Sequence, residues 1–126
     1  MMLQKKTIEL SKQLKFNEMQ SLIYFDALTN IHNRRYLEIQ GDKWIKQAKL
    51  ENRNIGCAII DIDNFKQIND QYGHKFGDEA IKYFAQQLNE AMEENMMCAR
   101  LGGDEFVILA RYKESYEKLY LRLFEK

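Results

Sequence analysis

Proline is absent from this sequence, only two cysteines are present, and 19 basic residues balance 19 acidic ones. Without proline, element boundaries must be read from Gly, Asn and Asp clusters and from changes in apolar period. Cys57 and Cys98 show no Cys-x-x-Cys spacing, which disfavours a disulfide framework and favours a reducing, cytoplasmic environment. The balanced charge supplies no overall field that would attract nucleic acid or an anionic membrane.

Long apolar runs are missing as well. No stretch approaches the roughly 20 residues that a membrane span needs, and the first residues lack the apolar core of a secretory signal. With 126 residues, 45% of them hydrophobic and 30% charged, the chain has the size and balance of one soluble globular domain.

Hydrophobic periodicity predicts a mixed α+β fold. Residues 3–25 have helical spacing, which predicts a leader helix that either packs on the domain or forms a coiled-coil connector weakened by Thr7, Asn17 and Ser21. A second helix is expected after Asn33, which is a good N-cap. The β-branched run from Ile55 to Ile62 is typical of a central strand covered on both faces.

The second half of the chain is also predicted to contain both helices and strands. A short turn with Phe65 and Ile68 leads to an amphipathic helix expected to begin at Asp78. Two apolar runs, 96–101 and 106–110, flank Gly102-Gly103-Asp104-Glu105 and predict a β-hairpin. Ser115 is expected to cap a last helix, and both cysteines are expected in the core.

Acidic residues interrupt these apolar strands at two points. Asp61 and Asp63 end the first strand, and Asp104 and Glu105 lie in the hairpin. If the strand pairs with the hairpin, the carboxylates meet at one edge of the sheet, in the oxygen-rich setting that Mg²⁺ prefers. Gly102 and Gly103 would leave space and free amides for phosphate oxygens.

Basic and helix-start groups would support such a site. Lys66 and the start of a short helix at Asn64 and Phe65 supply positive potential. The pattern indicates a metal-triphosphate site, where catalysis consists largely of positioning and charge neutralisation. Each element also has a structural explanation: a tight turn for the glycines, a helix cap for Asp63 and a solvated surface position for Lys66.

Four segments of the chain form a larger pattern. They are Asp26-Ala-Leu-Thr-Asn-Ile-His-Asn-Arg-Arg35, Asp61-Ile-Asp-Asn-Phe-Lys-Gln-Ile-Asn-Asp70, Gly73-His74 with Gly77-Asp78, and Ala99-Arg-Leu-Gly-Gly-Asp-Glu-Phe106. In order, spacing and residue types they resemble the GGDEF domain of bacterial diguanylate cyclases. The resemblance implies a domain from residue 26 to 126 after a leader of residues 1–25. It also implies a fold like that of nucleotide cyclase and polymerase palm domains, an antiparallel-rich sheet flanked by helices.

The resemblance also implies an activity and a set of site residues. The expected reaction joins two GTP molecules into cyclic di-GMP and releases two pyrophosphates. The metal, Mg²⁺ or alternatively Mn²⁺, would be held by Asp61, the Ile62 carbonyl, Asp104 and Glu105. Asp104 would also help to deprotonate the attacking hydroxyl, and the catalytic group comprises Asp104, Glu105 and Lys66. The residues expected to contact GTP are Asn64, Phe65, Lys66, Asn69, His74, Asp78, Gly102 and Gly103.

Asp78 has a chemical reason to favour guanine. A carboxylate accepts from guanine N1–H and its exocyclic amine, whereas adenine would leave the charge unpaired. The alternative is that Asp78 only caps the helix that it begins.

The resemblance further implies a homodimer, because one domain holds one GTP and two must face each other. The leader helix would relay a signal from an upstream sensor. At the two places of the family's inhibitory Arg-x-x-Asp stand Glu93 and Met96, so product inhibition by that route is not expected.

Two departures from the family pattern carry consequences. Asn30 replaces a usual Gly but tolerates positive φ. The family's later strands and last helix are missing after Lys126, which would leave one side of the first strand unpaired. The alternative function is therefore a catalytically inactive, truncated module that binds GTP or dimerises.

Overall fold

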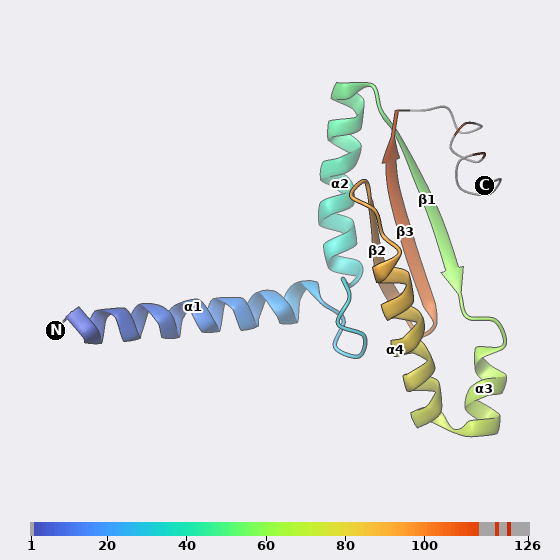
Figure 1. Ribbon diagram of the computed structural model, residues 1–126, viewed down its shortest axis with the longest axis horizontal. Coiled ribbons are helices and arrows are strands. Elements are labelled where there is room, and N and C mark those ends of the chain that lie inside the picture. The colour runs from blue at the N-terminus through green and yellow to red at the C-terminus, as the bar shows by residue number, and fades with distance from the viewer. Residues whose placement is uncertain (1, 114–117, 119–120, 122–126) are drawn as a thin grey trace.

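Three antiparallel strands form one sheet in the order β1-β3-β2 (Figure 1). The computed structural model describes residues 2–113, 118 and 121. Along the chain, the described elements are α1 (Met2–Tyr24), α2 (Arg34–Glu51), β1 (Asn54–Asp61), α3 (Phe65–Tyr72), α4 (His74–Glu90), β2 (Met96–Gly102) and β3 (Glu105–Tyr112). The predicted α+β class, the hairpin and its pairing with the first strand are confirmed.

The alternation of side chains along β3 places helices on both faces of the sheet. Phe106 packs against Phe84 of α4, with ring centroids 4.9 Å apart. On the opposite face, the guanidinium of Arg111 lies 4.5 Å from the ring centre of Trp44 in α2. On that face too, a Cβ built on Gly41 of α2 would lie 3.2 Å from Leu109. Glycine at this mid-helix position therefore lets α2 approach β3 closely.

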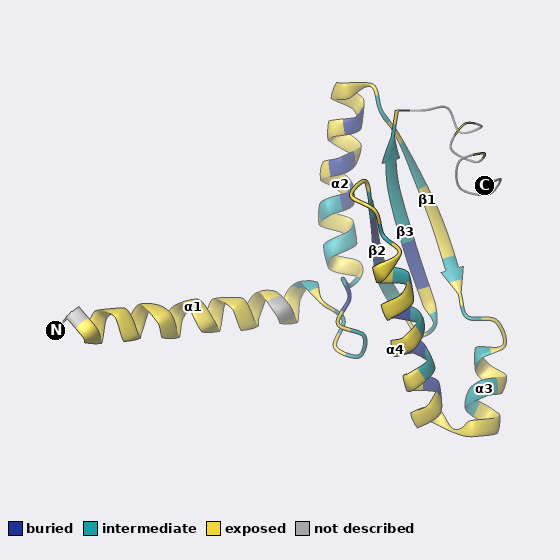
Figure 2. Ribbon diagram, in the orientation of Figure 1, coloured by how far each residue is buried: buried dark blue, intermediate teal, exposed yellow. Residues whose placement is uncertain are grey.

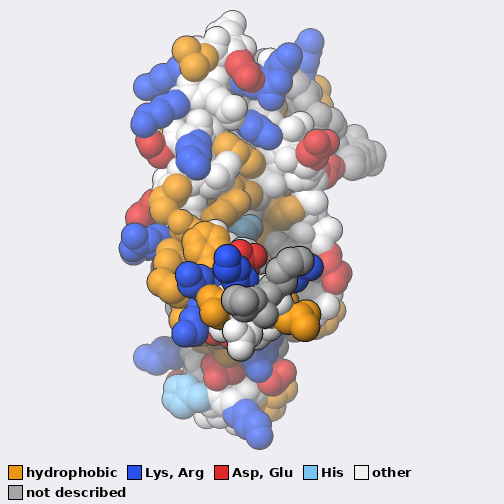
Figure 3. All heavy atoms as spheres, turned by 90° about the vertical axis from the view of Figure 1, so that its left-hand side faces the viewer, with side chains coloured by type: hydrophobic (Ala, Val, Ile, Leu, Met, Phe, Trp, Pro, Cys, Tyr) orange, Lys and Arg blue, Asp and Glu red, His pale blue; other side chains and the backbone are white. Residues whose placement is uncertain are grey.

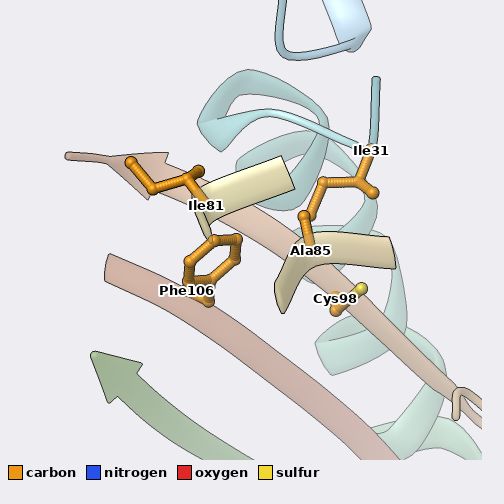
Figure 4. Packing of buried hydrophobic residues seen from close by; sticks show 5 residues of the cluster. All are labelled: Ile31, Ile81, Ala85, Cys98 and Phe106. Carbon is orange, nitrogen blue, oxygen red and sulfur yellow. The ribbon is translucent and has the colours of Figure 1, made fainter. Parts of the chain in front are cut away.

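The main hydrophobic cluster lies between the sheet and α4 (Figure 4). It joins Ile81 and Ala85 of α4 to Cys98 of β2 and Phe106 of β3, and the loop residue Ile31 closes it. Phe106 and Ala85 are fully inaccessible to solvent. This core fixes the hairpin that carries Asp104 and Glu105 relative to α4.

Strand β1 lies at the edge of the described sheet. It pairs with β3 from Asn54 opposite Tyr112 to Asp61 opposite Glu105, and its other side has no strand partner among the residues described. The prediction of a central strand covered on both faces is therefore wrong for the described chain, since part of β1 is exposed (Figure 2). The side chain of Ile59, for example, is 70% exposed. Cys57 is exposed too, so only Cys98 meets the prediction of a core cysteine.

Helix α1 projects away from the sheet instead of packing along the domain (Figure 1). The leader helix is confirmed, but its packing on the domain is wrong, because Leu3 and Leu22 are each 81% exposed. Only its end is anchored: the side chain of Asn33 donates to the carbonyl oxygen of Ile23 at 2.8 Å. The same Asn33 caps α2 by accepting from the amide of Tyr36, as predicted.

Of the two helices before the hairpin, α4 begins earlier than its sequence pattern predicts. Helix α4 starts at His74 after Gly73, so Asp78 lies inside the helix and is not its N-cap. The short helix expected to start at Asn64 and Phe65 is confirmed as α3, and its N-cap is Asn64 and not Asp63. Apart from residues 118 and 121, the helix expected after Ser115 lies outside the described residues.

The surface mixes charges of both signs. Lys and Arg side chains are interspersed with Asp and Glu over the face in Figure 3, in keeping with the zero net charge. Among the described helices, none combines the length and apolar character that crossing a bilayer would require.

Candidate active site

The pairing of β1 with β3 brings two of the expected metal-binding carboxylates side by side. Asp61, the last residue of β1, is the register partner of Glu105, the first residue of β3. Directly opposed residues in an antiparallel pair project from the same face, with Cβ atoms about 5 Å apart. We refer to Asp61, Asp104 and Glu105 as the acidic edge.

The hairpin turn is shaped by its two glycines. Gly102 and Gly103 have φ values of 148° and 53°, which residues with a Cβ rarely adopt. A Cβ built on either glycine would meet nothing within 4 Å. The turn therefore has open space beside it, and Asp104, half-buried, follows directly.

Arg100 fixes the conformation of this turn. Its Nε and Nη2 donate to the carbonyl oxygen of Gly103 at 3.0 and 2.8 Å. Its Nη1 donates to both carboxylate oxygens of Asp26 at 3.1 and 3.0 Å. The one sequence signal for this arginine is its charge within an apolar strand, because charged side chains are seldom buried without a partner.

Helix α3 begins four residues after the end of β1. Its N-cap, Asn64, has a left-handed φ of 57° and makes no side-chain capping hydrogen bond, so the first amides of the helix are not capped by that side chain. Lys66 is exposed in the first turn. Uncapped amides with an adjacent lysine form a setting suited to phosphate oxygens.

The expected base-contacting residues gather where α3 meets α4. Asn69 lies one turn after Phe65, about 6 Å further along the helix axis, and its side chain rests against Gly77 of α4. Asp78 follows Gly77 and is exposed, and His74 is exposed at the first turn of α4. A nucleotide with phosphates at the start of α3 would thus have its base near Asn69.

The acidic edge fits a divalent metal in its donor chemistry. It offers carboxylate oxygens, and the Ile62 carbonyl follows Asp61 in the chain; Mg²⁺ takes such donors and usually completes its shell with substrate phosphates and water. Among the described residues, no group of three or more His, Cys, Asp or Glu side chains is arranged to hold a metal by itself. The described geometry therefore suits an ion that arrives with a phosphate ligand.

Hollows also occur along the exposed helix α1. One such hollow lies on α1 between Leu14, Asn17, Glu18 and Leu22. All of these residues belong to one exposed helix, so the hollow is an open groove between neighbouring side chains and encloses nothing.

Comparison with known proteins identifies the family. Residues 23–122 match the family model described as diguanylate cyclase, GGDEF domain. The chain belongs to this family.

Curated relatives agree with the match. The chain is 34% identical over 98 residues to the diguanylate cyclase DgcS of Shewanella oneidensis, covering 78% of this chain and 33% of that protein. It is 43% identical over 84 residues to the response regulator PleD of Caulobacter vibrioides, covering 67% of this chain and 18% of that protein. The chain thus spans a third or less of the length of these two relatives.

A solved structure has the same architecture. The coiled coil and GGDEF domain of DgcB from Caulobacter crescentus, in complex with c-di-GMP, superimposes with a TM-score of 0.83 at 28% identity. The match covers 98% of this chain and 64% of that one. The projecting α1 and the sheet with its helices are therefore a known combination in this family.

Proposed function

We propose that this chain is the catalytic domain of a diguanylate cyclase, which condenses two GTP molecules into cyclic di-GMP. Each 3′-hydroxyl oxygen attacks the α-phosphorus of the other GTP, the bond to the bridging oxygen breaks, and two pyrophosphates leave. The observation that carries the proposal is the register of Asp61 opposite Glu105, beside a turn with open space at both glycines. Family membership supports it.

The residues of the acidic edge have separate tasks in this proposal. Asp61, Asp104, Glu105 and the Ile62 carbonyl would hold Mg²⁺, or Mn²⁺ in its place. When bound, the ion neutralises charge that develops on the phosphates. Asp104 accepts the proton of the attacking hydroxyl, and a half-buried position is compatible with that task.

The remaining residues orient the nucleotide. Asn64, Phe65 and Lys66 contact the phosphates at the start of α3, and Gly102 and Gly103 leave room for them. Asp78 accepts from the two donors on the guanine edge, with Asn69 and His74 beside it. Because Asp78 is not the N-cap of α4, the capping explanation of this residue no longer competes.

Two copies must cooperate, because one site presents one GTP and the reaction joins two. In this proposal α1 aligns the partners: it projects from the domain and exposes Leu3, Leu10 and Leu14, which recur at coiled-coil spacing. Residues 1–25 form this connector, and residues from 26 onward form the catalytic domain. A signal from a preceding sensor would enter through α1, in the cytoplasm, where GTP is available.

Product formation tests the proposal. The purified chain with GTP and Mg²⁺ should form cyclic di-GMP, and specific activity should rise with protein concentration because the active species is a dimer. Asp104→Ala combined with Glu105→Ala should abolish product. Asp42→Ala is the matched control, since Asp42 lies on the exposed side of α2, where it pairs with Lys46.

The contrary outcomes are specific. Product that survives the double substitution contradicts the assigned acidic edge. GTP binding without any turnover at every concentration would instead indicate an inactive binding or dimerisation module.

A further inference from the structure

Gly77 is the point at which helix α4 contacts the side chain of Asn69. A Cβ built on Gly77 would collide with the Asn69 amide oxygen, lie 2.9 Å from its Cγ and lie 3.4 Å from Cζ of Phe65. Gly77 itself is buried. Only a residue without a side chain therefore allows Asn69 to occupy its observed position.

The contact also explains an otherwise unpaired atom. The amide oxygen of Asn69 is buried and has no hydrogen-bond partner among the described residues. The Cα hydrogen of Gly77 that stands in the Cβ direction points at this oxygen, which is the geometry of a weak Cα–H···O contact. The oxygen is thus directed into α4 and away from any ligand.

The other end of the same amide is left for a ligand. Unlike the oxygen, the Asn69 nitrogen is not both buried and unpaired. Because the oxygen lies against Gly77, the N–H₂ end of the amide points away from that glycine and is the end left to donate. Asp78, the next residue after Gly77, presents only acceptors.

We propose that Gly77 is a positioning residue for base recognition: by holding the Asn69 oxygen inward, it fixes Asn69 as a donor beside the acceptor Asp78. Guanine offers the matching pattern, with two donors at N1 and N2 flanked by the acceptors O6 and N3. Adenine lacks both O6 and the exocyclic amine at C2. This inference rests on the proposed function, because it assumes that the base lies against Asn69 and Asp78.

A double-mutant cycle on the full chain separates this role from a general packing role. Binding is measured with 3′-deoxy-GTP, which lacks the attacking hydroxyl and cannot be condensed. Gly77→Ala should weaken binding about 3- to 10-fold, the range expected for one neutral hydrogen bond, and Asn69→Ala should do the same. In the Asn69→Ala background, Gly77→Ala should change binding less than about twofold, because the new methyl group then fits the vacated space.

Gly41→Ala is the matched control. Gly41 is also a buried helical glycine whose Cβ would meet only a side chain, Leu109 at 3.2 Å, but it lies in α2 on the opposite face of the sheet. Its substitution should leave 3′-deoxy-GTP affinity unchanged. Circular dichroism should show that all variants fold, since alanine favours helix over glycine.

NMR of the side-chain amide of Asn69 provides a readout that needs no nucleotide. Its resonances should shift in Gly77→Ala and stay in place in Gly41→Ala. The inference would be overturned if the Asn69 resonances stayed unchanged in Gly77→Ala. It would also be overturned if the loss of affinity in the double variant equalled the product of the losses in Gly77→Ala and Asn69→Ala. If the wild-type chain bound no 3′-deoxy-GTP, both the proposed function and the proposed base recognition would be overturned. A shift of the Asn69 amide resonances in Gly77→Ala would even then show that Asn69 lies against Gly77.

Discussion

Arg100 connects the carboxylate of Asp26 to the carbonyl oxygen of Gly103 through one guanidinium group. Asp26 and Arg100 are separated by 74 residues in the sequence. Asp26 also holds its own turn, accepting from the amide and hydroxyl of Thr29 at 2.9 and 2.8 Å. The end of the α1 connector and the glycine turn of the acidic edge are therefore mechanically linked.

Removal of this guanidinium should destabilise the domain. Arg100→Ala leaves the Asp26 carboxylate, whose side chain is only 19% exposed, without its ion-pair partner, and we expect a loss of about 2 kcal/mol in the free energy of unfolding. Urea unfolding monitored by circular dichroism measures it. Lys82→Ala, which breaks the exposed pair with Glu79, should cost less than about 0.5 kcal/mol. Equal costs for the two substitutions would refute the link.

Because of the same ion pair, the free energy of unfolding should depend on pH. Burial raises the pKa of Asp26, but hydrogen bonds from Thr29 and Arg100 outweigh it and hold the pKa below its ordinary value. A carboxyl group whose pKa is lower in the folded than in the unfolded chain stabilises the folded state at pH values above its unfolded pKa of about 3.9. This stabilisation is lost as the pH falls through the pKa of the folded state.

The wild type should therefore be more stable than Asp26→Asn at pH 6, and the difference between their free energies of unfolding should shrink as the pH falls to 3. His32, whose pKa burial lowers despite a hydrogen bond to the Tyr24 backbone, is present in both chains, so its contribution largely cancels in the difference. Free energies of unfolding at pH 6, 4 and 3 provide the measurement. A gap that stays constant with pH would show that the Asp26 proton is not linked to folding.

Much of the fold follows from sequence pattern because the pattern reports local burial. The two apolar runs that flank Gly102-Gly103 predict the hairpin, and the short β-branched run predicts β1. The pairing of the strand with the hairpin then brings Asp61 to Glu105. The Asn33 cap is equally local, since its side chain reaches only to the amide of Tyr36.

The remainder depends on contacts that no local pattern encodes. Whether α1 packs on the domain or projects from it depends on tertiary contacts, and its apolar spacing is compatible with both. The start of α4 at His74 was missed because the apolar period becomes clear only after Asp78. The Asn69–Gly77 contact joins two helices, so neither residue reveals it alone.

Phe106 should dominate the stability of the core. Its side chain is fully buried and its ring lies 4.9 Å from that of Phe84. Phe106→Ala should cost about 3–5 kcal/mol through lost burial and a cavity, measured by urea unfolding. Ile59→Ala on the exposed edge of β1 should cost less than about 1 kcal/mol, because Ile59 is 70% exposed. A larger cost at Ile59 would mean that β1 is covered in solution, for example by a second copy of the chain.

The two cysteines should differ sharply in reactivity. Cys57 is exposed on β1, whereas Cys98 is buried and its burial raises the pKa of the thiol to about 11. Because the thiolate is the reactive form, iodoacetamide at pH 8 should label Cys57 within minutes and Cys98 only after the chain unfolds in urea. Peptide mass spectrometry identifies each site, and Cys57→Ser removes the fast reaction as a control. Rapid labelling of Cys98 in the folded chain would show that the core between α4 and the sheet opens far more readily than its packing indicates.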